Sequence, residues 1–164
     1  MTRHDPLPKL RYTPCVPVTL FLASEGDKEH GEKILAVLQE FGVKTETFIA
    51  SAHKVPEKVH AKVEELNTRA EPTVLITCVG MSNGLSGVVA GSSIHPVIAC
   101  PVYKDKEDYL VNIHSTLQMP SDVPVLTVLD PKNAALAAVR ILALSDASLR
   151  KKVAERIQKV KAKY

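Results

Sequence analysis

The chain has 164 residues, of which 45% are hydrophobic and 24% are charged, and its formal net charge is +3. This composition is typical of a soluble globular protein, and no apolar stretch approaches the roughly 20 residues that span a membrane. Residues 1–15 lack the apolar core of a secretory signal, so we expect a Pro-rich polar arm at residues 1–16 and a single domain at residues 17–164.

Short apolar runs and segments of helical period alternate along the chain. The first run is almost continuously apolar, which suits a strand covered on both faces. The predicted strands are Pro17–Ala23, Val43–Ala50, Thr73–Val79, Pro96–Cys100 and Pro124–Leu129. The first predicted helix is Asp27–Phe41, and Gly42 ends it. The second has Pro56 near its first turn and buries Val59, Val63 and Leu66. The remaining predicted helices are Leu85–Ala90, Tyr109–Leu117, Asn133–Leu144 and 145–163.

This alternation predicts a fold class. Strands that alternate with helices at such spacing form βαβ units around a parallel sheet. Right-handed crossovers then place helices on both faces of the sheet. We predict a three-layer α/β/α sandwich with a central parallel sheet, flavodoxin-like or Rossmann-like, in one domain.

The C-terminal residues carry most of the positive charge. Residues 150–164 contain seven Lys or Arg and one Glu, whereas the rest of the chain is slightly acidic. A basic tail can bind nucleic acid, but the only aromatic residue here is Tyr164, which offers no stacking platform for bases. Leu149, Val153, Ile157 and Val160 recur at helical spacing. We therefore predict a helix that packs on its own protein with a solvated basic face, and no nucleic-acid partner.

The three cysteines do not form a metal-binding or disulfide pattern. Cys15, Cys78 and Cys100 are odd in number and lack CxxC spacing, which favours a reducing, cytoplasmic setting. Cys78 and Cys100 lie in apolar runs, where a free cysteine behaves as a small hydrophobic residue. No HxH, HxxxH or HExxH spacing exists either, so we expect no metal site.

Two polar clusters lie where predicted strands end. Ser51-Ala52-His53-Lys54 follows the second strand, and Gly80-Met81-Ser82-Asn83-Gly84 follows the third. Ligands of parallel α/β sheets bind in the crevice outside the carboxyl ends of the strands. The two clusters therefore predict one shared pocket, in which His53 can take or give a proton near neutral pH. A structural or merely exposed histidine is the competing interpretation, and His30, His60, His95 and His114 lack comparable polar neighbours.

The remaining candidate loops follow the first and third strands. Ala23-Ser24-Glu25-Gly26-Asp27 precedes a helix, whose N-terminus favours an anion. Asp27 would repel a phosphate, so it either caps the helix or accepts hydrogen bonds from a sugar diol. This loop is neither a Walker A motif nor a GxGxxG fingerprint. In the glycine-rich loop, glycine permits sharp turns and close approach to a ligand, although a plain connecting turn with a helix cap is the alternative.

Taken together, these segments resemble the aminoimidazole ribonucleotide (AIR) carboxylases of purine biosynthesis, the PurE family. Ser51-Ala52-His53-Lys54 is similar to the family's Ser-Ala-His-(Arg/Lys) segment, and the lysine resembles the CO2-using class II branch. Gly80-Met81-Ser82-Asn83-Gly84-Leu85 resembles the class II Gly-Arg-Ser-Asn-(Gly/Ala)-Leu loop. The likeness covers about Val18 to Leu144 and includes three further segments: Pro96–Pro101, Leu117–Ser121 and Pro131–Ala135.

The resemblance implies a reaction and a set of site residues. It implies carboxylation of AIR at C4 by CO2, with His53 as the proton-transferring residue and without metal, biotin or ATP. It also implies a homo-octamer with sites shared between subunits. Ser24, Ser51 and Lys54 are then candidate phosphate contacts, and Asp27 is a candidate for the ribose hydroxyls. The full set of expected substrate-binding residues is Ser24, Gly26, Asp27, Ser51, Ala52, Lys54, Gly80, Met81, Ser82, Asn83, Gly84 and Leu85.

Three departures from the family pattern leave alternatives open. Gly26 replaces a serine, Met81 replaces the class II arginine, and Asp122 replaces a glycine. These changes allow a non-catalytic or altered-substrate nucleotide-binding paralogue. The mutase reaction of the N5-carboxylated substrate is a further alternative, which Lys54 and Ser82-Asn83 disfavour.

Overall fold

The computed structural model describes residues 17–164, and the expected N-terminal arm at residues 1–16 lies outside this range. Its centre is a sheet of five parallel strands in the order β2-β1-β3-β4-β5. The strands are β1 (Val18–Leu22), β2 (Thr45–Ile49), β3 (Val74–Cys78), β4 (Val97–Ala99) and β5 (Leu126–Thr127). The predicted parallel sheet is therefore confirmed.

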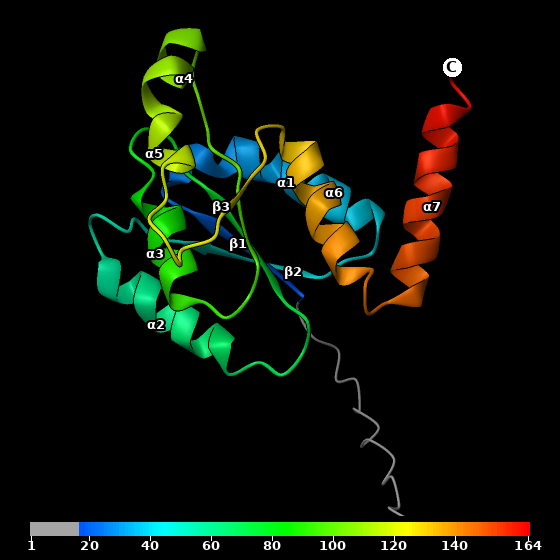
Figure 1. Cartoon of the computed structure of the whole chain (residues 1–164), viewed down its shortest axis with the longest axis horizontal. Helices are drawn as coiled ribbons and strands as arrows, with labels where there is room; N and C mark the ends of the chain where they lie inside the picture. The colour runs from blue at the N-terminus through cyan, green and yellow to red at the C-terminus, as the bar shows by residue number, and fades with distance from the viewer. Residues whose placement is uncertain (1–16) are drawn as a thin grey trace, which may run out of the picture.

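Helices cover both faces of this sheet, as predicted. Figure 1 shows α1 (Lys28–Glu40) and α6 (Pro131–Leu142) on one face, and α2 (Pro56–Asn67) and α3 (Gly84–Ser92) on the other. The short elements η1 (Glu25–Asp27), α4 (Lys106–Asn112) and α5 (His114–Leu117) lie in the connections, and α7 (Ala147–Lys161) ends the chain. The three-layer, flavodoxin-like α/β/α architecture is confirmed.

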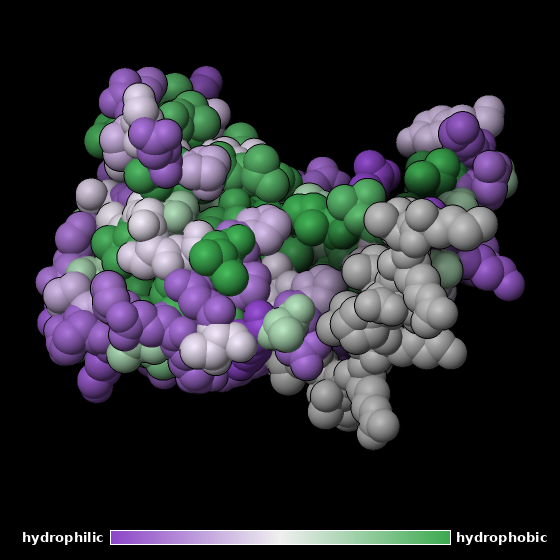
Figure 2. All heavy atoms as spheres, turned by 60° about the horizontal axis from the view of Figure 1, so that its bottom comes forward, coloured by the Kyte–Doolittle hydropathy of each residue, from purple (hydrophilic) through white to green (hydrophobic). Residues whose placement is uncertain are grey.

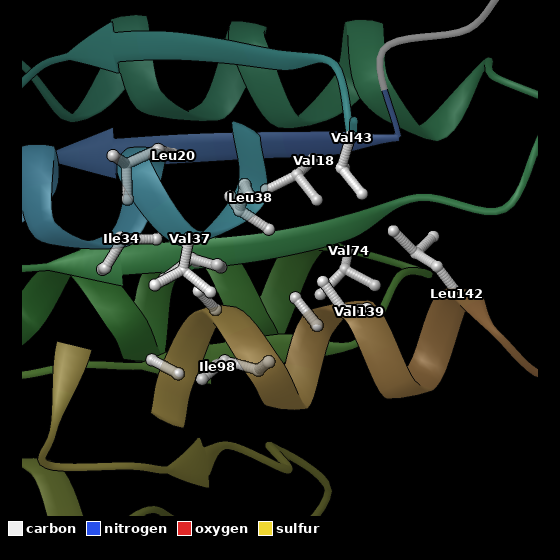
Figure 3. Close-up of a cluster of buried hydrophobic side chains, with 14 of the residues drawn as sticks. Val18, Leu20, Ile34, Val37, Leu38, Val43, Val74, Ile98, Val139 and Leu142 are labelled. Carbon is white, nitrogen blue, oxygen red and sulfur yellow. The ribbon is translucent and has the colours of Figure 1, made fainter. Parts of the chain in front are cut away.

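The central strands read as continuous apolar runs because both of their faces are buried. Every residue of β1 and β3 is buried, as parallel sheets between helix layers require. Leu20, Ile34 and Val139 belong to the core beneath α1 and α6, which Figure 3 shows. Phe21 and Val59 belong to a second core beneath α2 and α3. The period-two alternation of the strands thus divides the apolar side chains between two layers.

The predictions were least accurate between β4 and α6. The helix predicted over Tyr109–Leu117 begins three residues earlier and is divided into α4 and α5. The strand predicted over Pro124–Leu129 is reduced to Leu126–Thr127, a partly exposed strand at the edge of the sheet. A strand at the edge of a sheet has only one neighbouring strand to pair with. The apolar pattern of this segment therefore predicted a longer strand than the backbone pairing forms.

The C-terminal helix packs on the domain less fully than predicted. Leu149 is buried, but Val153 and Ile157 are only half-buried, and Val160 is 48% exposed. In Figure 2, apolar surface runs from the body of the domain toward α7, whose outer residues are mostly hydrophilic. Within residues 17–164, no helix is both long and apolar enough to cross a membrane.

The strand order fixes where a ligand can bind. From β1 the chain crosses through α1 to β2 on one side, and from β2 it returns through α2 to β3 on the other side of β1. The order therefore reverses between β1 and β3. At such a switch point, the loops after the two strands diverge and leave a crevice at the carboxyl edge of the sheet.

Candidate active site

Backbone hydrogen bonds hold the ends of the first three strands together. The Ala50 N–H donates to the Leu22 carbonyl (2.9 Å), and the Ala23 N–H donates to the Cys78 carbonyl (3.1 Å). The loops after β1, β2 and β3 therefore start side by side at the switch point. This is the arrangement predicted for the polar clusters at the strand ends.

The two clusters meet through His53 and Gly84. A Cβ atom built on Gly84 would lie 2.6 Å from His53 Nε2 and 2.9 Å from His53 Cε1. The imidazole ring therefore occupies the space that any larger side chain at position 84 would need. Gly84 is the first residue of α3, so the ring lies against the N-terminal end of that helix. His53 itself is exposed, which leaves the imidazole accessible to a ligand.

Asp27 is anchored by Ser24 in the loop after β1. Asp27 Oδ2 accepts hydrogen bonds from the Ser24 backbone N–H (2.8 Å) and from the Ser24 hydroxyl (2.9 Å). Asp27 occupies the N-cap position of α1, but its side chain makes no capping hydrogen bond to that helix. Asp27 as a whole residue is only 7% exposed, and Ser24 fixes the orientation of its carboxylate. Because both donors of Ser24 are engaged in this way, Ser24 acts on Asp27 in this structure.

Asn83 fixes the glycine-rich loop to its surroundings. Its side-chain oxygen accepts from the Ser86 N–H (3.0 Å) at the start of α3, and its amide nitrogen donates to the Thr116 hydroxyl (2.9 Å). The Asn83 backbone N–H donates to the Ser115 hydroxyl (3.0 Å). Asn83 is therefore a buried N-cap that joins α3 to α5. The capping-turn alternative describes this side chain correctly.

Met81 and Ser82 form the exposed part of the same loop. Met81 has φ 57° and is 73% exposed, and Ser82 is also exposed. A left-handed conformation is uncommon for methionine and stores strain of roughly 1–2 kcal/mol. Gly80 is bridged to Val102 after β4, and a Cβ on Gly80 would lie 3.2 Å from the Val102 carbonyl oxygen. The loop is thus held at both ends while its middle faces solvent.

The predicted site residues divide by accessibility. The exposed residues at the carboxyl edge of the sheet are Ser24, Gly26, His53, Lys54, Met81 and Ser82. Three more are partly buried: Ser51, Gly80 and Gly84. The others are buried: Asp27, Ala52, Asn83 and Leu85. Ala52 and Leu85 belong to the core beneath α2 and α3, so their side chains serve packing.

Sequence reasoning missed a thiol–imidazole cluster beside this site. His30, in the first turn of α1, has Nε2 3.3 Å from Cys100 Sγ, although it does not belong to either of the polar clusters at the strand ends. Cys78, the last residue of β3, and Cys100, which follows β4, are both buried in the same core. The sequence does contain a signal for this cluster, because Cys78 ends one strand and Cys100 directly follows another. Only the order of the strands in the sheet shows that the two cysteines are adjacent.

Other features of the surface lie away from the switch point. A hollow of about 320 Å³ lies at the opposite edge of the sheet, between residues such as Pro17, Val43 and Lys152. Another, of about 380 Å³, lies between α6 and α7. Among residues 17–164, no group of three or more His, Cys, Asp or Glu side chains is arranged to hold a metal ion.

The geometry agrees with comparisons to known proteins. The family model "AIR carboxylase" matches residues 17–163. This chain belongs to the AIR carboxylase family. The match covers nearly all of the described structure, including the three loops of the site, and the family is one of enzymes of purine biosynthesis.

Relatives within the AIR carboxylase family carry two different names. The chain is 41% identical to a phosphoribosylaminoimidazole carboxylase of Archaeoglobus fulgidus over 83% of this chain and 74% of the relative. It is equally 41% identical to an N5-carboxyaminoimidazole ribonucleotide mutase of Methanocaldococcus jannaschii, over 89% of this chain and 91% of the relative. The crystal structure of Treponema denticola PurE superposes with a TM-score of 0.83 at 38% identity, covering 89% of this chain and 92% of that chain.

Proposed function

We propose that this member of the AIR carboxylase family carboxylates AIR at C4 with CO2 to give 4-carboxy-5-aminoimidazole ribonucleotide. The observation that carries the proposal is the position of His53. An accessible imidazole lies against the N-terminal end of α3 at the switch point where α/β sheets bind ligands. A proton-transfer group at that place is what this reaction requires.

The proposed chemistry needs one proton transfer and one new carbon–carbon bond. AIR is an electron-rich, enamine-like ring, so C4 attacks the carbon of CO2. The adduct then loses its C4 proton to the His53 imidazole, which restores the aromatic ring. In the reverse direction, the imidazolium protonates C4 and CO2 leaves. No cofactor is part of this scheme.

The loop after β3 is proposed to hold the carboxylate that forms. Backbone N–H groups between Gly80 and Gly84, together with the dipole of α3, favour a negative charge next to the His53 ring. Ser82 is exposed there and can donate a further hydrogen bond. Asn83 contributes by fixing the loop, because its side chain is engaged with Ser86 and Thr116.

The loops after β1 and β2 are proposed to bind the ribose phosphate. Lys54 and Ser51 follow β2 and supply a cation and a hydroxyl for the phosphate, and the Gly26 backbone N–H supplies another donor. Asp27 is proposed to accept hydrogen bonds from the ribose hydroxyls. Ser24 then acts as the residue that orients Asp27.

An octameric, cytoplasmic enzyme completes the proposal. In a single chain, His53, Lys54, Met81 and Ser82 are all exposed, so a ligand held by them would be in contact with solvent. Catalysis that excludes water is favoured when such a site is covered. A second copy of the chain is proposed to provide that cover, in agreement with the octamer implied by the family resemblance.

Two other activities are consistent with the same fold. Gly26 and Met81 support a nucleotide-binding paralogue that has lost catalysis, and the mutase name of one relative keeps the N5-carboxylated substrate in consideration. Purified protein given AIR with bicarbonate and CO2 should form the C4 carboxylate. Turnover only of the N5-carboxylated substrate, with free CO2 removed, would identify a mutase, and nucleotide binding without either reaction would identify the paralogue.

The role of His53 can be tested by replacing it with asparagine. His53→Asn should lower turnover by about 10²–10⁴-fold, because the imidazole is the proposed proton carrier. Nucleotide affinity should change little, since the phosphate contacts are elsewhere. Steady-state kinetics and calorimetric binding measure the two effects. Near-normal turnover in this variant would remove His53 from the mechanism.

A further inference from the structure

Cys78 and Cys100 are cross-strand neighbours at the carboxyl edge of the sheet. Thr77 of β3 is paired with Ala99 of β4 in parallel register, and the Cys100 N–H donates to the Thr77 carbonyl (2.9 Å), so the register extends to the two cysteines. Neighbouring strands lie about 4.8 Å apart, which is within the range of Cα separations that a disulfide spans. Both side chains belong to the same core, so they lie on the same face of the sheet.

Cys100 is buried, but two of its contacts are with residues that are themselves partly exposed. Both cysteines have no exposed surface, but the Cys100 Sγ is covered by the His30 ring (3.3 Å) and lies 3.8 Å from the Leu129 carbonyl oxygen. His30 is itself partly exposed, and Leu129 is 46% exposed. The His30 side chain is therefore the group that a small neutral molecule must displace to reach the sulfur from this side.

The surroundings of Cys100 also favour its thiolate. The neighbouring Cys78 thiol and the nearby His30 ring together lower the pKa of Cys100 to about 6, against the opposing effect of burial. The neighbouring Cys100 sulfur and burial both raise the pKa of the Cys78 thiol. These opposite shifts favour the thiolate on Cys100 over the thiolate on Cys78, and the thiolate is the form that reacts with an oxidant.

We propose that Cys78 and Cys100 form a redox-sensitive thiol pair, which hydrogen peroxide converts into a reversible intrachain disulfide. In the first step, the Cys100 thiolate attacks one peroxide oxygen, the O–O bond breaks, and Cys100 becomes a sulfenic acid while the released hydroxide takes up a proton to form water. In the second step, the Cys78 sulfur attacks the Cys100 sulfur. The S–S bond forms as water leaves with the thiol proton of Cys78. Two thiols and one peroxide thus give one disulfide and two waters.

The disulfide would act on the candidate active site through the backbone. Gly80 lies two residues after Cys78, Val102 lies two residues after Cys100, and these two residues form a β-bridge. Drawing the strand ends together changes the glycine-rich loop, which the Asn83 cap and the Gly84–His53 contact otherwise fix. This consequence rests on the proposed function, whereas the formation of the disulfide does not.

The experiment uses the full chain carrying Cys15→Ser, so that only the pair can react. The folded protein is treated with hydrogen peroxide, then denatured and alkylated, and its mass is measured. We expect both thiols to escape alkylation after peroxide and to become alkylatable again after dithiothreitol. In Cys15→Ser/Cys78→Ser protein, Cys100 should instead be trapped by dimedone as a sulfenic acid. Full alkylation after peroxide, or a disulfide that forms only in unfolded or cross-linked protein, would overturn the proposal.

Matched histidine variants test the part played by His30. His30→Asn should slow disulfide formation several-fold, whereas His60→Asn, at an exposed position on α2, should leave the rate unchanged. Equal rates in all three proteins would show that His30 does not assist. Circular dichroism checks that each variant is folded before oxidation.

Nucleotide binding separates this inference from the proposed function. Calorimetric titration with AIR should show at least about tenfold weaker binding to the oxidised protein, restored by dithiothreitol. If the reduced protein binds no AIR, the proposed function fails and mass measurement still decides the thiol chemistry. A disulfide that leaves AIR affinity unchanged would overturn the control of the site.

Discussion

At the scale of single residues, Gly84 keeps open the space in which the His53 ring lies. The ring approaches to 2.6 Å of a Cβ atom at that position, a distance at which one of the two groups must move. The imidazole is the more mobile partner, because Gly84 belongs to the backbone of α3. Its position near a ligand therefore depends on the absence of a side chain at residue 84.

This dependence gives a prediction with a control in the same helix. Gly84→Ala should displace the imidazole and lower kcat/KM by at least about 10²-fold, since misplacing a catalytic group by about 1 Å has that effect. Gly87→Ala should leave kcat/KM nearly unchanged, because its Cβ would meet only Met119 Sδ at 3.6 Å. Kinetics and thermal unfolding of both variants measure the difference. Equal activities in the two variants would show that the ring tolerates displacement.

At the scale of elements, a group of ion pairs fastens α2 to the edge strand β2. Lys62 is only 8% exposed, and it contacts Glu46 on β2 and Glu65 on α2. Arg69 bonds the same two carboxylates at 3.0 and 3.2 Å. Removing one member of such a network leaves a mostly buried charge with fewer partners, which costs more than the loss of an exposed pair.

The pKa of Glu46 allows this network to be tested by pH. Burial alone would raise that pKa, but the hydrogen bonds from Lys62 and Arg69 outweigh burial and lower it. A lowered folded-state pKa stabilises the protein above the unfolded value of about 4.3, and this contribution is lost as the pH falls through the folded value.

Glu46→Gln should therefore lower the free energy of unfolding by about 1–2 kcal/mol at pH 7. This loss of unfolding free energy is at the low end for hydrogen bonds to charged groups, because Glu46 is one-third exposed and solvent partly screens its charge. The difference from the wild type should shrink as the pH falls below about 4. Urea unfolding at a series of pH values measures it, and a difference that is independent of pH would contradict this account.

At the scale of the whole molecule, α7 leaves an apolar hollow beside α6. The hollow is lined by Phe41, Leu136, Val153, Ile157 and Val160, with Arg140, Arg156 and Lys161 among its other lining residues. Arg156 joins α7 to Glu40 of α1 (2.6 Å), so the helix is held near the domain without closing the gap. The apolar stripe identified in the sequence is thus only partly covered within one chain.

The octamer in the proposed function makes a prediction for this helix. Ile157→Asp places a charge in the hollow and should shift the protein to a smaller assembly, because an unpaired charge disfavours burial against a second copy. Ala154→Asp changes an exposed position of the same helix and should assemble as the wild type does. Sedimentation velocity distinguishes the two variants, and identical assemblies for both would exclude the hollow as a subunit contact.

The sequence by itself determined the layers, the parallel sheet and the loops at the strand ends. Continuous apolar runs such as β1 are typical of strands between two helix layers, and the segments Ser51–Lys54 and Gly80–Gly84 each follow a predicted strand. Local patterns of this kind depend on neighbouring residues, so they can be interpreted without knowing the fold. The family resemblance added the chemistry.

Tertiary structure decided which side chains meet. The contact of His53 with Gly84, the engagement of Asn83 with Thr116, and the pairing of Cys78 with Cys100 each join residues that lie far apart in the sequence. Such contacts follow from strand order and register, which are set when the whole core packs. A local apolar pattern specifies that a face is buried, but not which segment covers it.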